Sequence, residues 1–416
     1  MEGGNFISPQ QDKFIAIDAL PGKGKTESLI KLINNASKDE RFLFITPYLD
    51  EVERIKKSCT RTFYEPSVEH GRGSKYRDIQ NLFSRGQNIA STHALFMRFN
   101  ETVEELIKAK GYTLILDEAI TPVQTRKIKK HDFETAIRDN KIEIDNKKFI
   151  RWKEGGYAGD YFAWMKYFAE RNCLMLSSDS DTGEDMEVTV WIYPIDILQA
   201  FNKVYIATYK IKGCLLHPYM TMHKINYQHM SMDNDYNIVS FDPLYEIEDR
   251  RKSKNLIDIY LGDNLNAVGS VENALSKSWF NDRNKKPLHK VLKDNLYNWY
   301  RYVNDAKSEL SLWTTFSDYK NLLKGKGFTK GFIPHNMRAT NEYRTRDVLA
   351  YCLNKYEVPT YLNIFPQDDK KGFQNELAIS GLIQWLWRSA LRDEKPIKLF
   401  IPSSRMRGLL MDWLDV

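Results

Sequence analysis

The feature that most constrains the fold of this chain is a glycine-rich string at residues 19–26, Ala-Leu-Pro-Gly-Lys-Gly-Lys-Thr. The apolar run 14–17 before it predicts a short buried strand, and residues 27–33 after it predict the first turns of a helix. A glycine-rich turn that enters a helix points several backbone N–H groups at one spot, and the helix N-terminus adds a partial positive charge there. The string therefore predicts a site that binds a triphosphate.

This string fits the phosphate-loop pattern G-x-x-x-x-G-K-[ST], with Ala19 in the place of the first glycine. The departure removes some backbone freedom without removing a phosphate ligand. We expect Lys25 to reach the β- and γ-phosphates of ATP and Thr26 to ligate Mg²⁺. The nucleotide-binding residues predicted from the pattern are Pro21, Gly22, Lys23, Gly24, Lys25 and Thr26. Because a turn can match the pattern by chance, a second element is needed.

That second element is an apolar strand predicted at 112–116, which ends in Asp117 and Glu118. At the end of a strand the chain turns, so both carboxylates can face the nucleotide edge of a parallel sheet. Asp117 would hold Mg²⁺ through water, and Glu118 would orient and deprotonate the attacking water. The alternative is an exposed acidic loop after a buried strand. Together with the phosphate loop, the pair favours ATP hydrolysis over nucleotide binding alone.

Charge is spread unevenly along the 416 residues. Residues 281–416 hold 23 Lys and Arg against 15 Asp and Glu, a net charge of +8, which leaves −2 for residues 1–280. A basic, aromatic-rich region is typical of a nucleic-acid track, because phosphate attraction supplies affinity and rings stack on bases. A solvated basic surface would have the same composition, so charge alone does not separate the two.

Other classes of site and location find little support in the sequence. The four cysteines form no C-x-x-C pair and the eight histidines no H-x-x-x-H spacing, which leaves Mg²⁺ on the nucleotide as the only expected metal. No apolar stretch approaches the roughly 18 residues that span a bilayer. The N-terminus has no basic start followed by an apolar run, as a signal peptide would. We therefore expect a cytoplasmic protein without membrane contact.

The order of predicted elements indicates two domains. Strands and helices alternate from Phe14 to Ile120, as in a doubly wound parallel sheet, and the regularity then weakens. We predict an N-terminal ATP-binding lobe at 1–219, with an insertion at about 121–187. The C-terminal lobe is predicted at 220–416, with an insertion at about 242–305.

With these pieces in order, the chain resembles superfamily 2 helicases and translocases, and most closely the helicase-like proteins that bacteriophages encode. The resemblance covers most of the chain by motif order, and the N-terminal motifs are the specific ones. It implies an α/β fold with two recombinase-like lobes, each with a parallel sheet, and insertions in both halves. In that family the lobes hold ATP in their cleft and nucleic acid across their tops. ATP closes the cleft, and hydrolysis opens it.

Several further motifs resemble the nucleic-acid contacts of this family. Hydroxyl and N–H groups at strand ends suit phosphates, because they fix register without reading sequence. The resemblance assigns this role to Thr46, Pro47, Thr92, His93, Arg338, Thr340, Asn341 and Arg344. A helix N-cap is another interpretation of Ser91 and Thr92, and it is compatible with phosphate contact. Thr208 stands where the family carries the element that couples hydrolysis to lobe movement.

Residues 384–392, Gln-Trp-Leu-Trp-Arg-Ser-Ala-Leu-Arg, are similar to the family's glutamine-and-arginine motif. In that motif an arginine of the second lobe reaches the γ-phosphate, which suits its planar, permanently charged fork. On one helix, Gln384, Arg388 and Arg392 would share a face. A tryptophan replaces the usual glycine and the second arginine comes one residue late, and we favour Arg392 as the finger with Arg388 as support. The alternative is an amphipathic helix whose arginines pair with surface carboxylates such as Asp393.

These features lead us to expect an ATP-dependent helicase or translocase that acts in phage replication or recombination. The expected partner is single-stranded or branched nucleic acid, with DNA favoured over RNA. One alternative is the ATPase motor of a phage terminase, although residues 281–416 show no acidic cluster of the kind a nuclease needs. Another is a nucleic-acid-binding protein that uses ATP as a switch and unwinds nothing.

Overall fold

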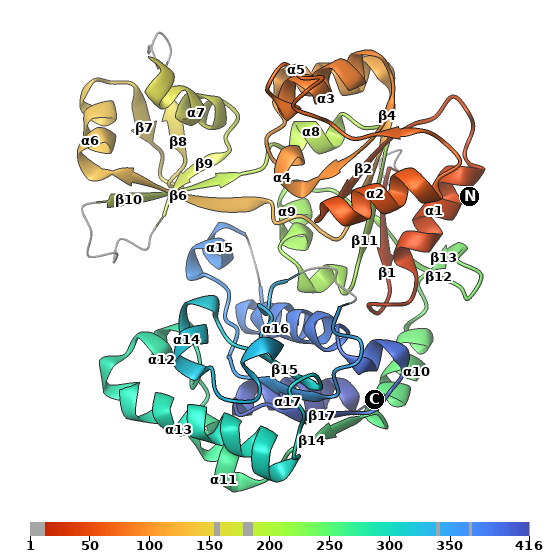
Figure 1. Ribbon diagram of the computed structural model, residues 1–416. Helices are drawn as coiled ribbons and strands as arrows, with labels where there is room; N and C mark the ends of the chain where they lie inside the picture. Colours follow the sequence, from red (N-terminus) through yellow and green to blue (C-terminus); the bar gives the residue numbers. More distant parts are fainter. Residues whose placement is uncertain (1–12, 154–158, 178–185, 338–341, 366–367, 416) are drawn as a thin grey trace, which may run out of the picture.

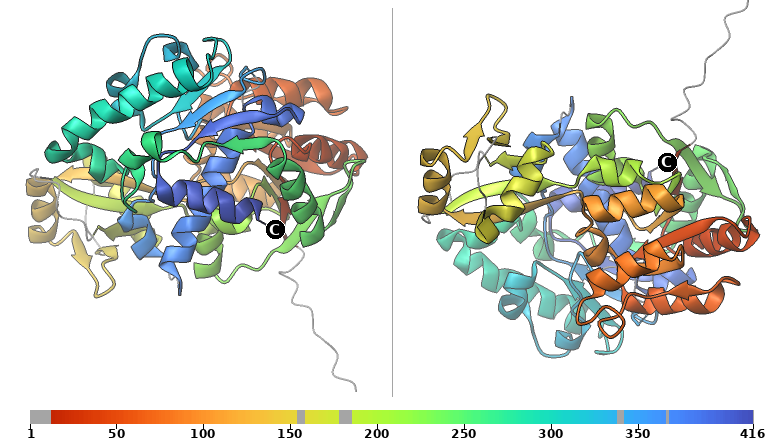
Figure 2. Two further views of the ribbon diagram at one scale, coloured as in Figure 1. Left: turned by 90° about the horizontal axis from the view of Figure 1, so that it is seen from below. Right: turned by 90° about the horizontal axis from the view of Figure 1, so that it is seen from above.

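The computed structural model describes residues 13–153, 159–177, 186–337, 342–365 and 368–415, and the description below concerns these residues. They form two α/β lobes stacked one over the other, with a small subdomain beside the first lobe (Figure 1). Seen from below and from above, the two lobes lie one behind the other (Figure 2). Of the described helices, none is long and apolar enough to cross a membrane.

The first lobe is built on an eight-stranded sheet in the order β13-β12-β1-β11-β5-β2-β4-β3. Every neighbouring pair is parallel except β12 with β13. The strands are β1 (Phe14–Asp18), β2 (Arg41–Thr46), β3 (Phe63–Tyr64), β4 (Asn88–Thr92), β5 (Tyr112–Asp117), β11 (Lys203–Thr208), β12 (Gln228–Met232) and β13 (Ile238–Ser240). Parallel strands end at the same edge, so the residues that follow β1, β5 and β11 come together there.

Helices cover both faces of this sheet, because successive strand residues point to opposite sides. In β1, Ile15 and Ile17 join the core under α1 and α2, whereas Phe14 and Ala16 join the core under α3 and α5. The helices of this lobe are α1 (Lys25–Asn35), α2 (Leu49–Ser58), α3 (Lys75–Ser84), α4 (His93–Phe96), α5 (Glu101–Lys110), α8 (Ile195–Gln199) and α9 (Leu216–Met222).

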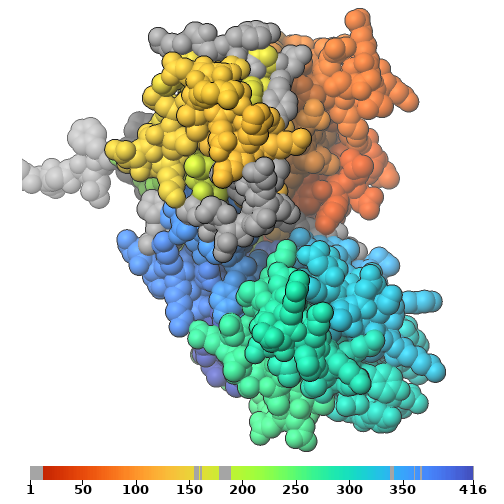
Figure 3. Space-filling model, turned by 90° about the vertical axis from the view of Figure 1, so that its left-hand side faces the viewer, coloured from red at the N-terminus to blue at the C-terminus, as the bar shows by residue number. Residues whose placement is uncertain are grey.

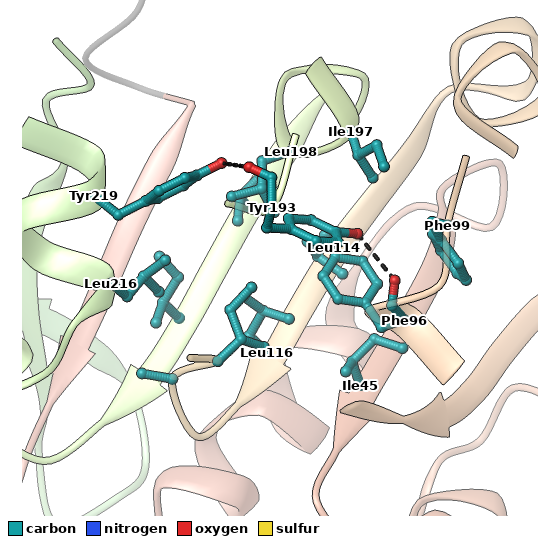
Figure 4. Close-up of a cluster of buried hydrophobic side chains, with 14 of the residues drawn as sticks. Ile45, Phe96, Phe99, Leu114, Leu116, Tyr193, Ile197, Leu198, Leu216 and Tyr219 are labelled. Carbon is teal, nitrogen blue, oxygen red and sulfur yellow. Dashed lines mark hydrogen bonds between the residues drawn. The ribbon is translucent and has the colours of Figure 1, made fainter. Parts of the chain in front are cut away.

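The larger of these two cores satisfies its buried polar groups internally. Tyr193 is fully buried, and its hydroxyl donates to the carbonyl oxygen of Phe96 at 3.0 Å. Tyr219, also fully buried, donates to the carbonyl oxygen of Tyr193 at 2.7 Å (Figure 4). Since an unmade buried hydrogen bond costs about 1–3 kcal/mol, these bonds fix how α4, α9 and the chain before α8 pack on the sheet.

The expected insertion at about 121–187 folds as a subdomain with its own core. Its elements are β6 (Val123–Lys129), α6 (Lys130–Arg138), β7 (Ile142–Ile144), β8 (Ile150–Trp152), α7 (Gly159–Glu170), β9 (Leu174–Leu176) and β10 (Met186–Ile192). They form a three-stranded sheet, β6-β10-β9, and the hairpin β7-β8, around buried side chains such as Phe133, Ile150 and Met165. The subdomain stands above the second lobe on the face that Figure 3 shows.

The second lobe carries a four-stranded, all-parallel sheet in the order β14-β17-β16-β15. Its strands are β14 (Ile257–Ile259), β15 (Ser311–Thr314), β16 (Val348–Tyr351) and β17 (Ile397–Phe400). Its helices are α10 (Pro243–Lys254), α11 (Asp263–Asn266), α12 (Lys277–Asn281), α13 (Lys286–Asn298), α14 (Lys320–Leu323), α15 (Pro359–Ile364), α16 (Lys370–Leu386) and α17 (Ser404–Leu414). Helix α16 lies on the side of the sheet that faces the first lobe (Figure 1).

The two-lobed α/β class predicted from the sequence is confirmed, but two expected boundaries need correction. Strands β12 and β13 pair with β1, so the first lobe continues to Ser240, past the expected end at residue 219. Strand β14 lies within the segment expected as an insertion at about 242–305, yet it pairs with β17. That segment is therefore partly integral to the second sheet. Sequence patterns missed both points because short strands of five or three residues carry little periodicity.

Candidate nucleotide site between the lobes

The phosphate loop leaves β1 and enters α1 at the sheet edge described above. Gly22 and Gly24 both have left-handed backbones, with φ of 87° and 93°, which glycine adopts without steric cost. Helix α1 begins at Lys25, directly after Gly24. The two glycines thus let the loop turn directly into α1, with Ala19 in the place of the first glycine of the pattern.

Lys25 is buried beneath this loop. Its Nζ donates to the carbonyl oxygens of Ala19 at 2.7 Å and Leu20 at 3.1 Å. Burial lowers the pKa of Lys25, while the nearby carboxylates of Glu118 and Asp18 raise it. The ammonium group is therefore held in place by two carbonyls that phosphate oxygens can replace.

Thr26 and Asp117 meet at the start of α1 and the end of β5. The Thr26 hydroxyl lies 3.3 and 3.4 Å from the two carboxylate oxygens of Asp117. Burial, followed by the charges of Glu118 and Glu51, raises the pKa of Asp117 to about 7. A cation would offset the repulsion from these carboxylates and favour the ionised form of Asp117, and a hydroxyl with a carboxylate is a donor set that suits Mg²⁺. The residues present therefore fit the expected metal.

Glu118 follows Asp117 in an unusual backbone conformation. Its φ is 72°, in the left-handed region that costs a non-glycine residue about 1–3 kcal/mol. Its N–H donates to the carbonyl oxygen of Ala207 at 2.8 Å, and its carboxylate accepts from the Thr208 hydroxyl at 3.5 Å. The end of β11 thus holds Glu118 in place, and it brings the predicted coupling residue into contact with the predicted base.

Residues of both lobes line one cavity of about 300 Å³. Lys25, Thr26, Asp117 and Glu118 come from the first lobe. The second lobe contributes Gln384, Arg388 and Arg392. All the residues predicted to do chemistry on the nucleotide therefore share one space.

The sequence predicted one helix for Gln384, Arg388 and Arg392, but the structure places them on separate elements. Helix α16 ends at Leu386, after Gln384, and Ser389 then has an extended backbone, with φ −88° and ψ −167°. The Ser389 hydroxyl oxygen accepts from the N–H of Leu391 at 3.3 Å and so starts a separate 3₁₀ turn that carries Arg392. A serine that caps a new turn explains why helical spacing was the wrong guide here.

Arg392 lies directly over the phosphate loop. Its Cγ and Nε are 3.5 and 3.9 Å from the point that a Cβ on Gly22 would occupy. Burial and the neighbouring Arg344 lower its pKa. Asp393, a carboxylate considered as a partner for these arginines, is bound by Arg344, whose Nε lies 2.9 and 3.1 Å from its oxygens. Arg388 is buried and lines the same cavity.

The predicted nucleic-acid contacts are less well placed. Thr46 is fully buried, and its hydroxyl has no hydrogen-bond partner among the described residues, so a strand cannot reach it in this conformation. Pro47 lines the nucleotide cavity. Thr92 occupies the N-cap position of α4, and Nε2 of His93 lies 3.2 Å from the carbonyl oxygen of Asp117. Arg344 is held by Asp393, and the remaining three expected contacts fall outside the described residues: Arg338, Thr340 and Asn341.

Sequence reasoning missed several residues of the site. Glu51 and Arg54 of α2 line the cavity and pair with each other at 3.1 Å. Tyr236, in the turn between β12 and β13, also lines it. The spacing of Glu51 and Arg54 fits a helix-surface ion pair, but that is a common pattern with no functional meaning of its own. Tyr236 lies in no motif.

The lobes are joined next to the site. Leu20 of the phosphate loop and Tyr209, which follows Thr208, belong to the same buried cluster as Ile383 and Trp413 of the second lobe. The Trp413 indole N–H donates to the Tyr209 hydroxyl at 2.9 Å. Lys210 forms an ion pair with Glu376 of α16. The segment after β11 therefore links the nucleotide cavity to the second-lobe core.

Two family models and one solved structure agree with this architecture. A family model described as "Type III restriction enzyme, res subunit" matches residues 4–132, and one described as "YonV C-terminal Rossmann-like domain" matches residues 251–414. Among solved structures, "XPD_Helicase" is similar over 96% of this chain and 95% of that one, with a TM-score of 0.51 and 11% identity. The DUF1998 helicase MrfA, solved bound to DNA and AMPPNP, matches 97% of this chain and 48% of its own with a TM-score of 0.35 and 8% identity.

The fold, the motifs and the family match over residues 4–132 make the chain similar to superfamily 2 helicases, as the resemblance predicted. A relative with higher sequence identity defines the family of this chain more narrowly. The chain is 39% identical over 413 residues to the "SPbeta prophage-derived uncharacterized protein YonV" of Bacillus subtilis (strain 168), which covers 96% of this chain and 98% of that protein. The chain belongs to the YonV family.

Proposed function

We propose that this protein is an ATP-dependent helicase or translocase on single-stranded or branched nucleic acid, with DNA as the favoured substrate. The observation that carries the proposal is the cavity to which one lobe contributes Lys25, Thr26, Asp117 and Glu118 and the other contributes Arg392. A site divided between two lobes can turn over only when the lobes are close. Hydrolysis and lobe movement are then linked.

In this proposal the phosphate loop binds the triphosphate, and Lys25 exchanges its two carbonyl partners for phosphate oxygens. Thr26 and Asp117 would hold Mg²⁺, which would neutralise part of the phosphate charge. Glu118 accepts a proton from the attacking water, which it also orients. Arg392 stabilises the charge that develops on the γ-phosphate oxygens, and Arg388 and Gln384 line the same cavity.

We propose that the effect of phosphate release is transmitted to the second lobe through the end of β11. Thr208 contacts Glu118, and the next residue, Tyr209, is hydrogen-bonded to Trp413. A change at Glu118 therefore has a path into the second-lobe core through the Thr208 side chain, the backbone of residues 208–209 and the Tyr209 side chain. The charge of +8 on residues 281–416 supports a nucleic-acid partner for that lobe.

The test is ATP turnover with and without single-stranded DNA, single-stranded RNA or a forked duplex. We expect DNA to stimulate turnover, and a forked duplex to be unwound in a strand-displacement assay. Binding and hydrolysis without strand release would support the ATP-switched binding protein instead. Turnover that no nucleic acid stimulates would overturn the proposal.

A further inference from the structure

Two cavities lie on either side of the short helix α15. One, of about 290 Å³, is lined by residues 146–148 in the turn between β7 and β8, by residues of β9 and β10, and by the last two residues of α15. The other, of about 400 Å³, is lined by α15, the first turns of α16 and Arg405 near the start of α17. Asn363 lines both cavities, so they adjoin at this residue. We call the two together the α15 groove.

The α15 groove has one wall on the subdomain and the other on the second lobe. Leu362 of α15 and Phe365, directly after the helix, are buried in the same core cluster as Val190 of the subdomain. Helix α15 therefore lies below the subdomain (Figure 1), on the side of the molecule where the subdomain stands over the second lobe (Figure 3). A ligand in the groove would touch both parts of the molecule.

The lining of the α15 groove is strongly basic. Among the described residues that line it, five positive charges stand against one negative charge, that of Glu272, which gives a net charge of +4. Glu272 lies 3.6 Å from Nζ of Lys371, so the one carboxylate is already paired. The basic residues are Lys147 and Lys148 on the subdomain and Lys370, Lys371 and Arg405 on the second lobe. Such a lining selects an anionic ligand with charges on both sides of α15.

Groups that can contact bases and sugars lie between these charges. The amide side chains of Asn146, Asn363 and Gln374 line the groove and can both donate and accept hydrogen bonds. Tyr356 is 38% exposed, and the Arg405 guanidinium lies over its ring at 4.2 Å from the centroid. A basic groove with an aromatic ring for stacking is typical of sites for single-stranded nucleic acid. In a duplex the bases stack on one another, and their faces are not available to such a ring.

We propose that the α15 groove binds a single strand of nucleic acid through its phosphates, with the subdomain and the second lobe as the two walls. This inference rests on the proposed function for the class of partner, and it adds a site to that function. The residues that line the groove are separate from those that line the nucleotide cavity. They are also separate from the contacts that the sequence predicted at strand ends, such as Thr46 and Thr92.

Helix α16 connects the α15 groove to the nucleotide cavity. Lys370 and Lys371 begin the helix, and Gln384, near its end, lines the nucleotide cavity. At 1.5 Å per residue these two ends of α16 are about 20 Å apart. Between them, Glu376 forms an ion pair with Lys210 of the segment after β11. A strand held at the first turn of α16 therefore acts on the nucleotide cavity through one continuous helix.

The test measures binding of fluorescein-labelled oligo(dT) and of a DNA duplex, each about 20 nucleotides long, by fluorescence anisotropy over a range of salt concentrations. One double variant changes the subdomain wall and another the second-lobe wall. A third changes two exposed lysines of α13, which line neither cavity, and is the charge-matched control. In that order, the variants are Lys147→Ala with Lys148→Ala, Lys370→Ala with Lys371→Ala, and Lys290→Ala with Lys293→Ala.

We expect each groove variant to bind oligo(dT) about tenfold more weakly than wild type. The slope of log affinity against log salt should decrease in magnitude by about 1.4, because each lost phosphate contact on a single strand contributes about 0.7. The oligo(dT) concentration that half-saturates the stimulation of ATP turnover should rise by about tenfold as well. The control variant should match wild type in affinity and slope, and the duplex should lose less affinity than oligo(dT) in the groove variants.

Two results would overturn the inference. One is that the groove variants bind oligo(dT) with the affinity and salt slope of the control, and the proposed function would survive this result if DNA still stimulates wild-type turnover. The other is an equal loss of affinity for the duplex, which would rule out a single-strand site. If the groove variants lose oligo(dT) binding as expected but oligo(dT) leaves wild-type ATP turnover unchanged, the proposed function fails while the groove stands.

Discussion

The two halves of the nucleotide cavity are built in different ways. In the first lobe, Asp18, Asp117 and Thr208 are the last residues of three neighbouring parallel strands, and the strand register alone brings them together: Asp18 pairs with Thr208, and Ala207 with Asp117. In the second lobe, Arg392 sits in a short 3₁₀ turn beyond the end of α16. The first half is fixed by backbone hydrogen bonds, whereas the second depends on how the lobes pack.

This difference separates two roles. A rigid half can bind and orient the nucleotide by itself, and a half on a separate lobe can supply or withdraw the charge that speeds turnover. Variants in the first half should therefore remove binding or chemistry outright. Variants at the junction should change how well chemistry is coupled to the second lobe. The predictions below test this division, from the largest expected effect to the smallest.

Replacing Lys25 tests the rigid half most severely. Lys25→Ala removes the charge under the phosphate loop, and we expect ATP turnover to fall by about 1,000-fold or more, the scale of a lost preorganised charge contact. Lys38→Ala, in the exposed segment after α1, is the control and should retain full activity. Steady-state phosphate release measures both. Residual activity above a tenth of wild type in Lys25→Ala would show that the loop does not serve the reaction.

Glu118→Gln keeps the shape of the side chain but removes its capacity to accept a proton. Because general base catalysis contributes about 10²–10⁴-fold, we expect kcat to fall on the order of 100- to 1,000-fold while ATP binding is retained. Single-turnover kinetics and calorimetry separate the two effects. Glu105→Gln, on the exposed side of α5, should leave both unchanged. A variant that loses ATP binding instead would place Glu118 in the binding half of the mechanism.

The pH dependence of metal binding tests the Thr26–Asp117 pair. With its pKa raised to about 7, Asp117 is mostly protonated at pH 6 and mostly ionised at pH 8, so protons compete with Mg²⁺ at the lower pH. We expect the affinity for Mg²⁺ alone to be about tenfold higher at pH 8 than at pH 6, as measured by calorimetry. Asp117→Asn should lose this dependence. A Mg²⁺ affinity that is independent of pH in the wild type would contradict the assignment.

Tyr209→Phe affects the junction and should have the smallest effect. It removes the hydrogen bond from Trp413 but keeps the ring, so the free energy of unfolding should fall by about 1 kcal/mol. If this contact carries the coupling, stimulation of ATP turnover by single-stranded DNA should fall about threefold, with basal turnover unchanged. Equal loss of basal and stimulated turnover would indicate a merely structural role.

The same contrast explains what the sequence could predict. The loop at residues 19–26 and the Asp117–Glu118 pair meet at one sheet edge, as expected, because an apolar strand followed by a polar end has a local signature and parallel strands meet at one edge. The contact between Thr208 and Glu118 follows from the same register. The left-handed backbone conformation of Glu118 could not be predicted from the sequence, because glutamate rarely adopts this conformation.

For the half of the cavity on the second lobe, the sequence predicted which residues take part but not how they are arranged. Gln384, Arg388 and Arg392 were named, yet a break at Ser389 replaced the expected helix. Tyr236 escaped notice because its position depends on β12 joining the edge of a sheet that starts more than two hundred residues earlier. Such long-range pairing has no local pattern. It also placed β12 and β13 in the first lobe against expectation.

The central claim is that an arginine of the second lobe completes the site. The most direct test measures kcat for ATP hydrolysis and ATP affinity in Arg392→Ala and Arg388→Ala. The account predicts that Arg392→Ala lowers kcat by about 1,000-fold, within the range of arginine-finger effects, while ATP affinity changes less than about threefold. Arg388→Ala should have a smaller effect on kcat. Turnover in Arg392→Ala within threefold of wild type would contradict a site shared between the lobes.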